Sequence, residues 1–359
     1  MSGYNYAIIL NLFRKGEQCM KFDVTIFPDN LNMATETARR VEEYGFDGLW
    51  TAETAHNPFL PLTHAAAATH RIKLGTAIAV AFPRSPMVTA QIAWDLAEQS
   101  QGRFILGLGT QIKAHITKRF STEWSAPVPR LREYIEAMRA IWSTWQHNTP
   151  LRYTGEHYRF TLMTPFFAPN PMLYWNIPIY IAGVNEGLCR LAGELCQGFH
   201  VHSFHTVRYL KECIIPNIEI GLKRANREPG DVALACAIFV VTGRNEDEMR
   251  NNTVSVKSQI AFYASTPSYR AVMDLHGWGE IAERLNQMTR EGRWMELWEL
   301  VSDEMLDEFA VVGASDELAH KVKARYEGLL DRVGYYWPFK PEEVDKAYLW
   351  ESAAKVFVG

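Results

Sequence analysis

Short apolar segments alternate with longer amphipathic segments along most of this chain. The pattern is clearest where apolar residues 72–80 are followed by a helical segment, 87–99, and then by a second apolar segment, 102–110. The apolar segments carry almost no charge, as strands do when both faces of a parallel sheet are covered. The segment between them is long enough for a right-handed crossover connection. This stretch therefore predicts a β–α–β unit.

The same alternation predicts eight strands, each followed by a helix. The strands are expected at 21–27, 46–51, 72–80, 102–110, 177–183, 198–203, 232–242 and 332–337, and the helices at 33–44, 61–69, 87–99, 129–145, 186–195, 207–225, from 315, and 341–356. Eight consecutive strand–helix units predict a TIM (β/α)8 barrel. An open doubly wound sheet is the alternative, and it is disfavoured because no predicted strand is followed by Gly-x-Gly-x-x-Gly.

Two segments interrupt this alternation. Residues 150–176, after the fourth helix, predict a small hairpin excursion around Gly155. Residues 245–307, after the seventh strand, are mostly helical in pattern and longer than a crossover needs, so we expect a helical insertion or lid. We interpret residues 20–359 as one barrel domain. Residues 1–19 form an extension whose basic residues follow its apolar stretch, the wrong order for a signal peptide.

Composition narrows the functional class. The chain has 359 residues and a formal net charge of −4, which argues against nucleic acid as a partner. Membrane insertion is not expected either, because no apolar run approaches the roughly 20 residues that a spanning helix needs. The five cysteines are odd in number and include no Cys-x-x-Cys pair, which fits a reducing cytoplasm. No set of His, Asp and Glu has convincing metal-ligand spacing, and no Gly-x-Ser-x-Gly motif occurs.

Five short pieces of sequence together resemble one enzyme superfamily. They are Tyr44–Trp50, Leu74–Ile78, Gly102–Thr110, Ile179–Asn185 and Val312–Ala314. In this order and spacing they resemble the luciferase-like monooxygenases, and within them the branch of oxidoreductases that use coenzyme F420, a deazaflavin. The resemblance covers residues 20–356.

The resemblance implies an oxidoreductase in which reduced coenzyme F420 exchanges a hydride with a small organic substrate. An alternative is a monooxygenase that uses FMN and oxygen. A second alternative is a barrel subunit that binds cofactor without catalysis. Relatives are often dimers, and the eleven Trp and fifteen Tyr residues are compatible with a homodimer.

The resemblance also assigns cofactor-binding residues. Gly183, Val184 and Asn185 stand where the family holds the cofactor's phosphate, although the residues alone favour an ordinary Gly-containing turn with an Asn cap. Ala77 and Ile78 stand where the superfamily commonly has a non-proline cis peptide behind the cofactor ring. Thr110 and Gln111 match a polar pair that contacts the cofactor in relatives.

The expected catalytic residues depart from those of a sugar-phosphate dehydrogenase relative. Thr54 stands where that relative has its catalytic His, and Ile112 where it has its catalytic Glu, so a glucose-phosphate reaction is doubtful. Glu53, in the place of the preceding acidic residue, and His56 are the candidate catalytic residues, with His56 as a possible proton donor.

Two further groups could contact ligands. His200 and His202 alternate on the sixth strand, so we expect one to face the barrel as a substrate contact and the other to face a helix. Lys113, His115, Lys118 and Arg119 form a basic patch after the fourth strand. This patch either steers the acidic tail of a deazaflavin or is a solvated loop.

Overall fold

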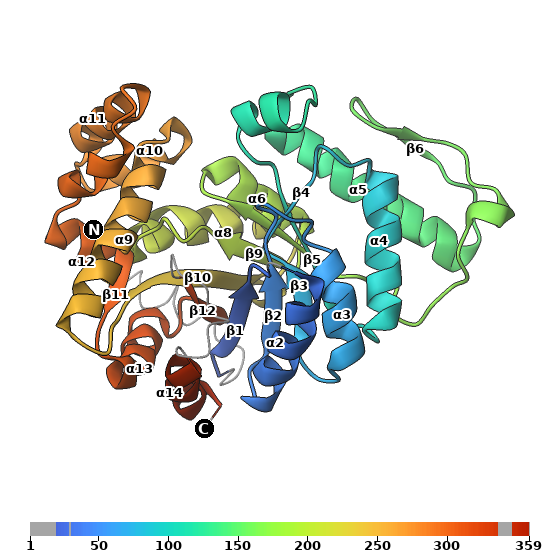
Figure 1. Ribbon diagram of the computed structural model, residues 1–359. Coiled ribbons are helices and arrows are strands. Elements are labelled where there is room, and N and C mark those ends of the chain that lie inside the picture. The colour runs from blue at the N-terminus through green and yellow to red at the C-terminus, as the bar shows by residue number, and fades with distance from the viewer. Residues whose placement is uncertain (1–18, 29, 337–346, 359) are drawn as a thin grey trace.

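Eight parallel strands close into a ring in the computed structural model, which describes residues 19–28, 30–336 and 347–358 (Figure 1). In ring order they are β1 (Lys21–Ile26), β2 (Gly48–Thr51), β3 (Lys73–Thr76), β5 (Phe104–Gly109), β8 (Ile179–Gly183), β9 (Gly198–Val201), β10 (Ala233–Val241) and β12 (Arg332–Tyr336). The pairing of β12 with β1 closes the ring. The prediction of a TIM barrel is confirmed.

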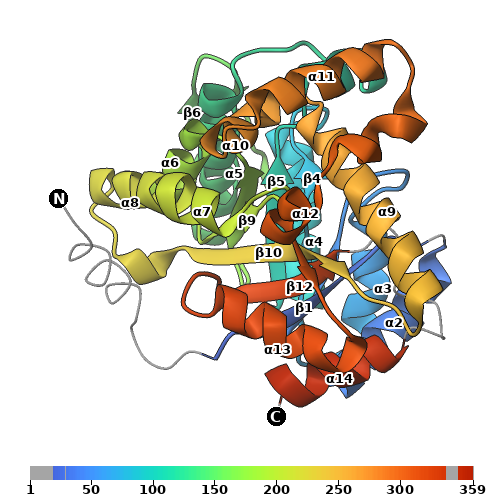
Figure 2. The same ribbon diagram turned by 90° about the vertical axis from the view of Figure 1, so that its left-hand side faces the viewer.

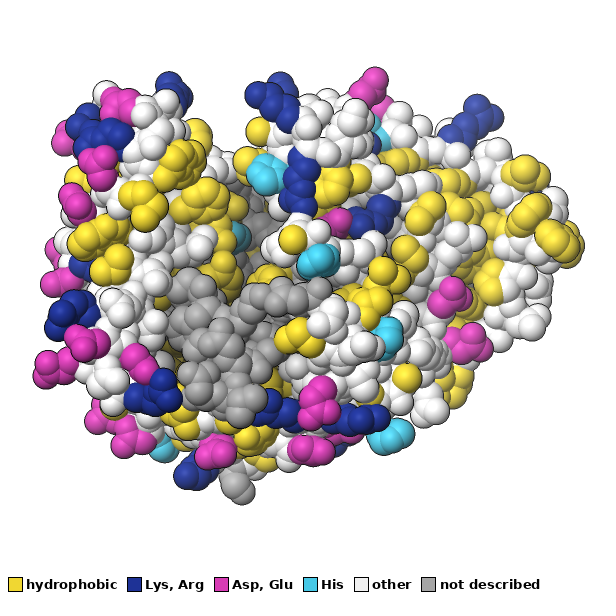
Figure 3. All heavy atoms as spheres, in the orientation of Figure 1, with side chains coloured by type: hydrophobic (Ala, Val, Ile, Leu, Met, Phe, Trp, Pro, Cys, Tyr) yellow, Lys and Arg dark blue, Asp and Glu magenta, His cyan; other side chains and the backbone are white. Residues whose placement is uncertain are grey.

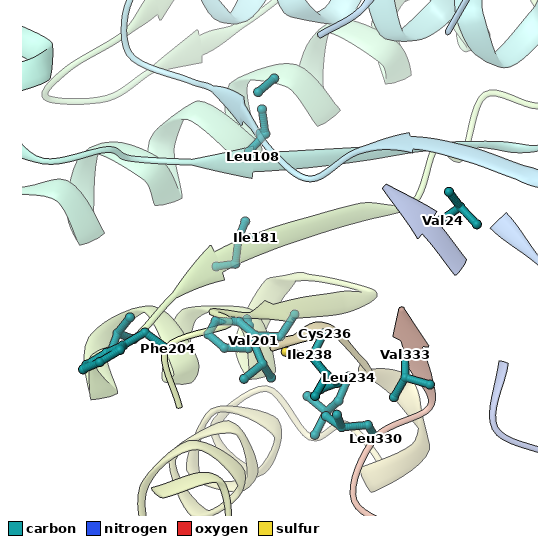
Figure 4. Packing of buried hydrophobic residues seen from close by; sticks show 14 of the residues in the cluster. Val24, Leu108, Ile181, Val201, Phe204, Leu234, Cys236, Ile238, Leu330 and Val333 are labelled. Carbon is teal, nitrogen blue, oxygen red and sulfur yellow. The ribbon is translucent and has the colours of Figure 1, made fainter. Parts of the chain in front are cut away.

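Helices surround this ring and cover its outer face. They are α2 (Leu31–Glu43), α3 (Leu60–Ala68), α4 (Pro86–Gln99), α5 (Pro127–His147), α6 (Glu186–Leu195), α7 (Val207–Tyr209), η3 (Leu210–Ile214), α8 (Ile215–Arg224), α13 (Ser315–Tyr326) and α14 (Ala347–Phe357). Val24, Leu108, Ile181 and Val333 point outward from their strands into the apolar layer beneath these helices (Figure 4). This layer is the main core. The predicted strand end at Trp337 and the helix start at Pro341 lie outside the described residues.

The third predicted strand is not continuous. It divides into β3 and β4 (Ala79–Val80), which pairs with Leu108 and Gly109 of β5. The peptide bond between Ala77 and Ile78 lies between the two strands and is cis, as the family resemblance implied. A prediction based on apolar runs cannot detect this break, because the residues on both sides of it are equally apolar.

The excursion after α5 is a hairpin of β6 (Tyr153–Thr154) and β7 (Arg159–Phe160). Glu133 of α5 holds its turn, because its carboxylate accepts hydrogen bonds from the backbone N–H groups of Glu156, His157 and Tyr158. The carboxylates of Glu133 and Glu156 lie close to the His157 ring, but the oxygens of Glu133 are already used in the turn. We therefore interpret this group as a cap of the hairpin.

The second interruption is a helical segment between β10 and β11 (Ala310–Val312). It contains α9 (Glu246–Ala264), η5 (Pro267–Tyr269), α10 (Arg270–Leu275), α11 (Gly279–Arg290), η6 (Trp294–Leu300) and α12 (Asp303–Phe309). Figure 2 shows it above the barrel on the side of β10. We call residues 246–309 the helical insertion. Among the described residues, no helix is both long and apolar enough to cross a bilayer.

Small residues dominate the inward-facing positions toward the carboxyl ends of the strands. Gly109, Ala182, Ala237 and Gly334 all line the space inside the ring. Below them, a Cβ added at Gly107 would lie 1.7 Å from the carbonyl oxygen of Thr76 and 3.0 Å from Nε2 of His200. Glycine is therefore required at residue 107, and the small residues above it leave the upper barrel open.

We predict that Gly107→Ala lowers the free energy of unfolding by about 3 kcal/mol, because the new methyl group overlaps the strand backbone at Thr76. Urea unfolding followed by circular dichroism measures this change. Gly230→Ala is the matched control, because no atom lies within 4 Å of the added Cβ. Equal stability of the two variants would contradict the prediction.

Candidate active site

A cavity of about 590 Å³ opens at the carboxyl ends of the barrel strands. Residues from all eight ring strands or the loops that follow them line it, together with α9 and η5 of the helical insertion. Figure 3 shows the molecule hollowed between the helical insertion and the helices around α5. Its size suits a small ligand, and its position is the one that TIM-barrel enzymes use for catalysis.

The floor of the cavity is a buried ion pair. Asp23 accepts hydrogen bonds from Nε and Nη2 of Arg332 at 2.7 and 2.6 Å, and from the indole N–H of Trp50 at 2.8 Å. Burial opposes the charge on Arg332, but the Asp23 carboxylate more than offsets it and raises the pKa of Arg332. The two charges therefore neutralise each other beneath the cavity.

Glu53 supports the segment that contains the cis peptide. Its carboxylate accepts from both Nη atoms of Arg84, at 2.7 and 2.8 Å, and from the backbone N–H of Val80 at 2.7 Å. Its own N–H donates to the carbonyl of Ile78. Both carboxylate oxygens are therefore held by Arg84 in a bidentate pair, which leaves them poorly placed to exchange a proton with a ligand. A positioning role therefore fits Glu53 better than the predicted catalytic role.

His56 is exposed in the loop after β2 and is not among the residues that line the cavity. The geometry thus gives no support to His56 as the proton donor, and that role stays a prediction.

The predicted cofactor-binding residues all line the cavity. Ala77 and Ile78 lie between β3 and β4, Thr110 and Gln111 follow β5, and Gly183, Val184 and Asn185 join β8 to α6. The structure therefore brings together residues that are far apart in the sequence. Their contact with a cofactor stays a prediction.

The amino end of α6 is available to an anion. Among the described residues no side chain caps it, since the side-chain oxygen of Asn185 accepts no hydrogen bond from the first turn. The amide N–H of Asn185 donates to the carbonyl of Ser268 at 3.2 Å. Glu186, whose charge would repel an anion, is paired with Arg190 at 2.5 Å. Uncapped N–H groups at the start of a helix are a suitable site for phosphate.

The expectation for His200 and His202 was wrong, because both side chains line the cavity. Residues two apart along a strand project from the same face, so alternation places them together. Burial lowers the pKa of His200 to about 3 and that of His202 to about 4, so both rings are neutral near pH 7. The Nε2 atom of His200 is buried without a hydrogen-bond partner among the described residues.

The basic patch after β5 divides in two. Arg119 donates to the carbonyl of Thr54 and is used structurally, whereas Lys113 is exposed and lines the cavity. Of the four charged side chains that line the cavity in the described part of the chain, Asp23, Glu53 and Arg332 have ion-pair partners. Lys113 is therefore the one available to a negatively charged ligand.

Sequence reasoning missed several residues of this site. Asp23 and Arg332 carried a usable signal, because each is a charged residue within an otherwise apolar strand. Tyr263 and Tyr269 carried none, because they lie in the helical insertion, whose pattern does not indicate which side faces the barrel. Tyr336 closes the wall from the end of β12.

A closed eight-stranded barrel with a ligand-sized cavity at the carboxyl ends of its strands defines an enzyme-like, ligand-binding TIM barrel. The sequence profile of the luciferase-like monooxygenase family matches residues 15–332. The chain therefore belongs to the luciferase-like monooxygenase family, whose members are oxidoreductases.

Individual relatives are consistent with this family. An uncharacterised protein of Mycobacterium tuberculosis is 44% identical over 318 residues, which cover 89% of this chain and 93% of the relative. The 5,10-methylenetetrahydromethanopterin reductase of Archaeoglobus fulgidus is 27% identical over 333 residues, covering 90% and 95%.

Solved structures share the fold. The coenzyme F420-dependent tetrahydromethanopterin reductase of Methanopyrus kandleri superposes with a TM-score of 0.76 at 22% identity, covering 94% of this chain and 98% of that one. The oxygenating component of 3,6-diketocamphane monooxygenase of Pseudomonas putida, solved with FMN, superposes with a TM-score of 0.66 at 16% identity, covering 94% and 97%.

We predict that Arg332→Met lowers the free energy of unfolding by about 3–5 kcal/mol, because it leaves the Asp23 carboxylate buried without a counter-charge. Urea unfolding measures the loss. Arg250→Met is the control, since Arg250 pairs with Asp247 on the surface, where both side chains are largely exposed and the expected change is below about 1 kcal/mol. A loss this small for Arg332→Met would contradict the prediction.

We also predict that the protein loses stability as the pH falls from about 7 to about 5. Burial lowers the pKa of His200, His202 and His205 from 6.5 to about 3, 4 and 4. Between pH 6.5 and these pKa values the unfolded chain binds more protons than the folded protein does. Each additional proton lowers the free energy of unfolding by about 1.4 kcal/mol per pH unit.

Urea unfolding at the two pH values measures this effect, with an expected loss of at least about 3 kcal/mol. His205 does not line the cavity. The variant His205→Gln should lose less stability between the two pH values than the unaltered protein, because one of the three buried histidines is absent. A free energy of unfolding that is the same at both pH values would contradict the burial of neutral histidines.

Proposed function

We propose that the protein is an oxidoreductase that binds coenzyme F420 across the mouth of the barrel and uses it on a small organic substrate. The observation that carries the proposal is the arrangement of three features around one cavity. These are the backbone at Ala77 and Ile78 between β3 and β4, the uncapped amino end of α6, and the exposed Lys113 at the rim.

The residues present fit such a cofactor. The small residues Gly109, Ala182 and Ala77 leave space for a flat ring system against the strand ends. Backbone N–H groups at the start of α6 would hold a phosphate, and Lys113 would attract the carboxylates of an acidic tail. A reduced deazaflavin bound there supplies hydride chemistry.

This chain's own residues have separate tasks in the proposal. Glu53 and Arg84 hold the segment behind the ring in place, and the neutral pair of Asp23 and Arg332 forms a floor that offers no free charge. The walls exclude water from the reacting atoms. The coenzyme F420-dependent reductase of Methanopyrus kandleri supports deazaflavin chemistry, whereas the shared fold of the FMN-containing monooxygenase keeps FMN with oxygen as the second candidate.

Side-by-side binding measurements test the proposal. We expect coenzyme F420 to bind with a Kd in the micromolar range or below and FMN to bind at least about tenfold more weakly, both followed by fluorescence. Tight FMN binding without deazaflavin binding would overturn the proposal in favour of the monooxygenase. Binding of coenzyme F420 without turnover of any carbonyl compound or alkene would favour the non-catalytic subunit.

The expected homodimer stays a prediction.

A pair of variants tests the phosphate site. Gly187 lies in the first turn of α6. Gly187→Asp adds a negative charge beside the N–H groups, whereas Gly187→Asn has the same shape without the charge. We expect the affinity for coenzyme F420 to be about tenfold lower in the Asp variant than in the Asn variant. Equal affinities would place the phosphate elsewhere.

A further inference from the structure

One wall of the cavity is built of an imidazole and three phenols. His202 follows β9, Tyr263 and Tyr269 come from the helical insertion, and Tyr336 ends β12. The ring of His202 lies edge-on to Tyr263, with centroids 4.7 Å apart, and 4.8 Å from the ring of Tyr269. This packing fixes the position of the His202 imidazole.

The hydrogen bonds of His202 determine which ring nitrogen carries the proton. The backbone N–H of Phe204 donates to Nδ1 of His202 at 3.0 Å, so Nδ1 holds a lone pair. Because burial keeps the ring neutral near pH 7, its single proton is on Nε2. Nε2 lies 3.4 Å from the hydroxyl oxygen of Tyr269, and the Nε2–H group therefore donates to that oxygen.

Because the hydrogen bond runs from His202 to Tyr269, the hydroxyl proton of Tyr269 makes no hydrogen bond to His202. His202 is the one hydrogen-bond partner of the Tyr269 hydroxyl within the described ranges, and the His202 nitrogen is a donor, so it cannot accept the Tyr269 proton. The neighbouring hydroxyls of Tyr263 and Tyr336 bond to each other at 3.3 Å. Burial raises the pKa of Tyr269 to about 12, so the phenol keeps its proton near pH 7.

We infer that the Tyr269 hydroxyl is the hydrogen-bond and proton donor to the oxygen of a neutral, aromatic or flat apolar carbonyl substrate, and that His202 positions it. The inference rests on the proposed function and adds the substrate class and the donor. It fills a role for which Glu53, bound to Arg84, and His56, outside the cavity lining, are unsuited.

The distribution of charge in the cavity supports an uncharged substrate. Asp23 is paired with Arg332 and Glu53 with Arg84, so the described cavity walls offer a charged substrate no partner except Lys113. Lys113 is exposed at the rim, where the proposed cofactor tail needs it. Aromatic rings surround the remaining space, and they favour a flat apolar molecule. They are Phe27, Trp124, Tyr263, Tyr269 and Tyr336.

The proton balance of the reduction is simple. When a hydride from the two-electron oxidation of the reduced cofactor reaches the carbonyl carbon, the π electrons of the C=O bond move to oxygen. That oxygen takes the Tyr269 proton, and the O–H bond of the phenol breaks. Water then returns a proton to the phenolate, and the alcohol leaves.

Infrared spectroscopy tests the hydrogen bond without turnover. The probe is acetophenone labelled with ¹³C at its carbonyl, bound to the full chain and to the variants Tyr269→Phe and Tyr326→Phe. Tyr326 is the control because its buried hydroxyl has no hydrogen-bond partner in the described part of the chain and Tyr326 is not among the residues that line the cavity. We expect the carbonyl band at lower wavenumber in the unaltered protein and in Tyr326→Phe than in Tyr269→Phe.

An unshifted band in Tyr269→Phe, or no acetophenone binding at millimolar concentration, would overturn the inference. Kinetics give a second readout. With saturating reduced coenzyme F420, kcat for acetophenone should fall by about 10²–10⁴-fold in Tyr269→Phe, with cofactor affinity unchanged. His202→Gln, whose amide can still donate to Tyr269, should keep a larger kcat than His202→Leu. Equal kcat in these two variants would refute the positioning role.

The outcomes separate this inference from the proposed function. A band shift without any turnover would sustain the hydrogen-bond donor and reject the proposed reaction. Turnover that is equal in the unaltered protein and Tyr269→Phe would sustain the proposed reaction and reject the donor.

Discussion

The ion pair between Asp23 and Arg332 joins the first and the last strand of the barrel. These residues are 309 positions apart in the sequence, yet they lie on the neighbouring strands β1 and β12, whose pairing closes the ring. A buried pair of this kind adds little net stability, because desolvation offsets most of the attraction. Its contribution is to fill the lower barrel with a neutral, tightly bonded group, above which small residues leave the cavity open.

Two parts of the chain build the two sides of this cavity. The ends of β3, β5 and β8 supply backbone and small side chains, which suit contact with a flat ring and a phosphate. The helical insertion supplies the large polar rings of Tyr263 and Tyr269. The barrel thus provides the backbone and small side chains of the cavity, while the insertion provides phenol rings of its wall.

The sequence predicted the repeating architecture well, because each strand–helix unit has its own local hydrophobic period. The family resemblance, and not the local pattern, pointed to the loop residues around Thr110 and Val184, which line the cavity. The sequence could not identify the Tyr269–His202 contact, which joins the helical insertion to a residue that lies 67 positions earlier, directly after β9. The expectation that His200 and His202 point to opposite sides was an error of reasoning. Residues two apart along an extended chain project from the same face, and the sequence alone was enough to show this.

The hydrogen bond from Asn185 to Ser268 joins the start of α6 to the residue beside Tyr269. A molecule that settles at the start of α6 therefore also steadies the short turn that carries the phenol. Occupation of the start of α6 by the coenzyme would also order the wall against which the carbonyl compound packs. The two ligands would therefore bind cooperatively, each more tightly in the presence of the other.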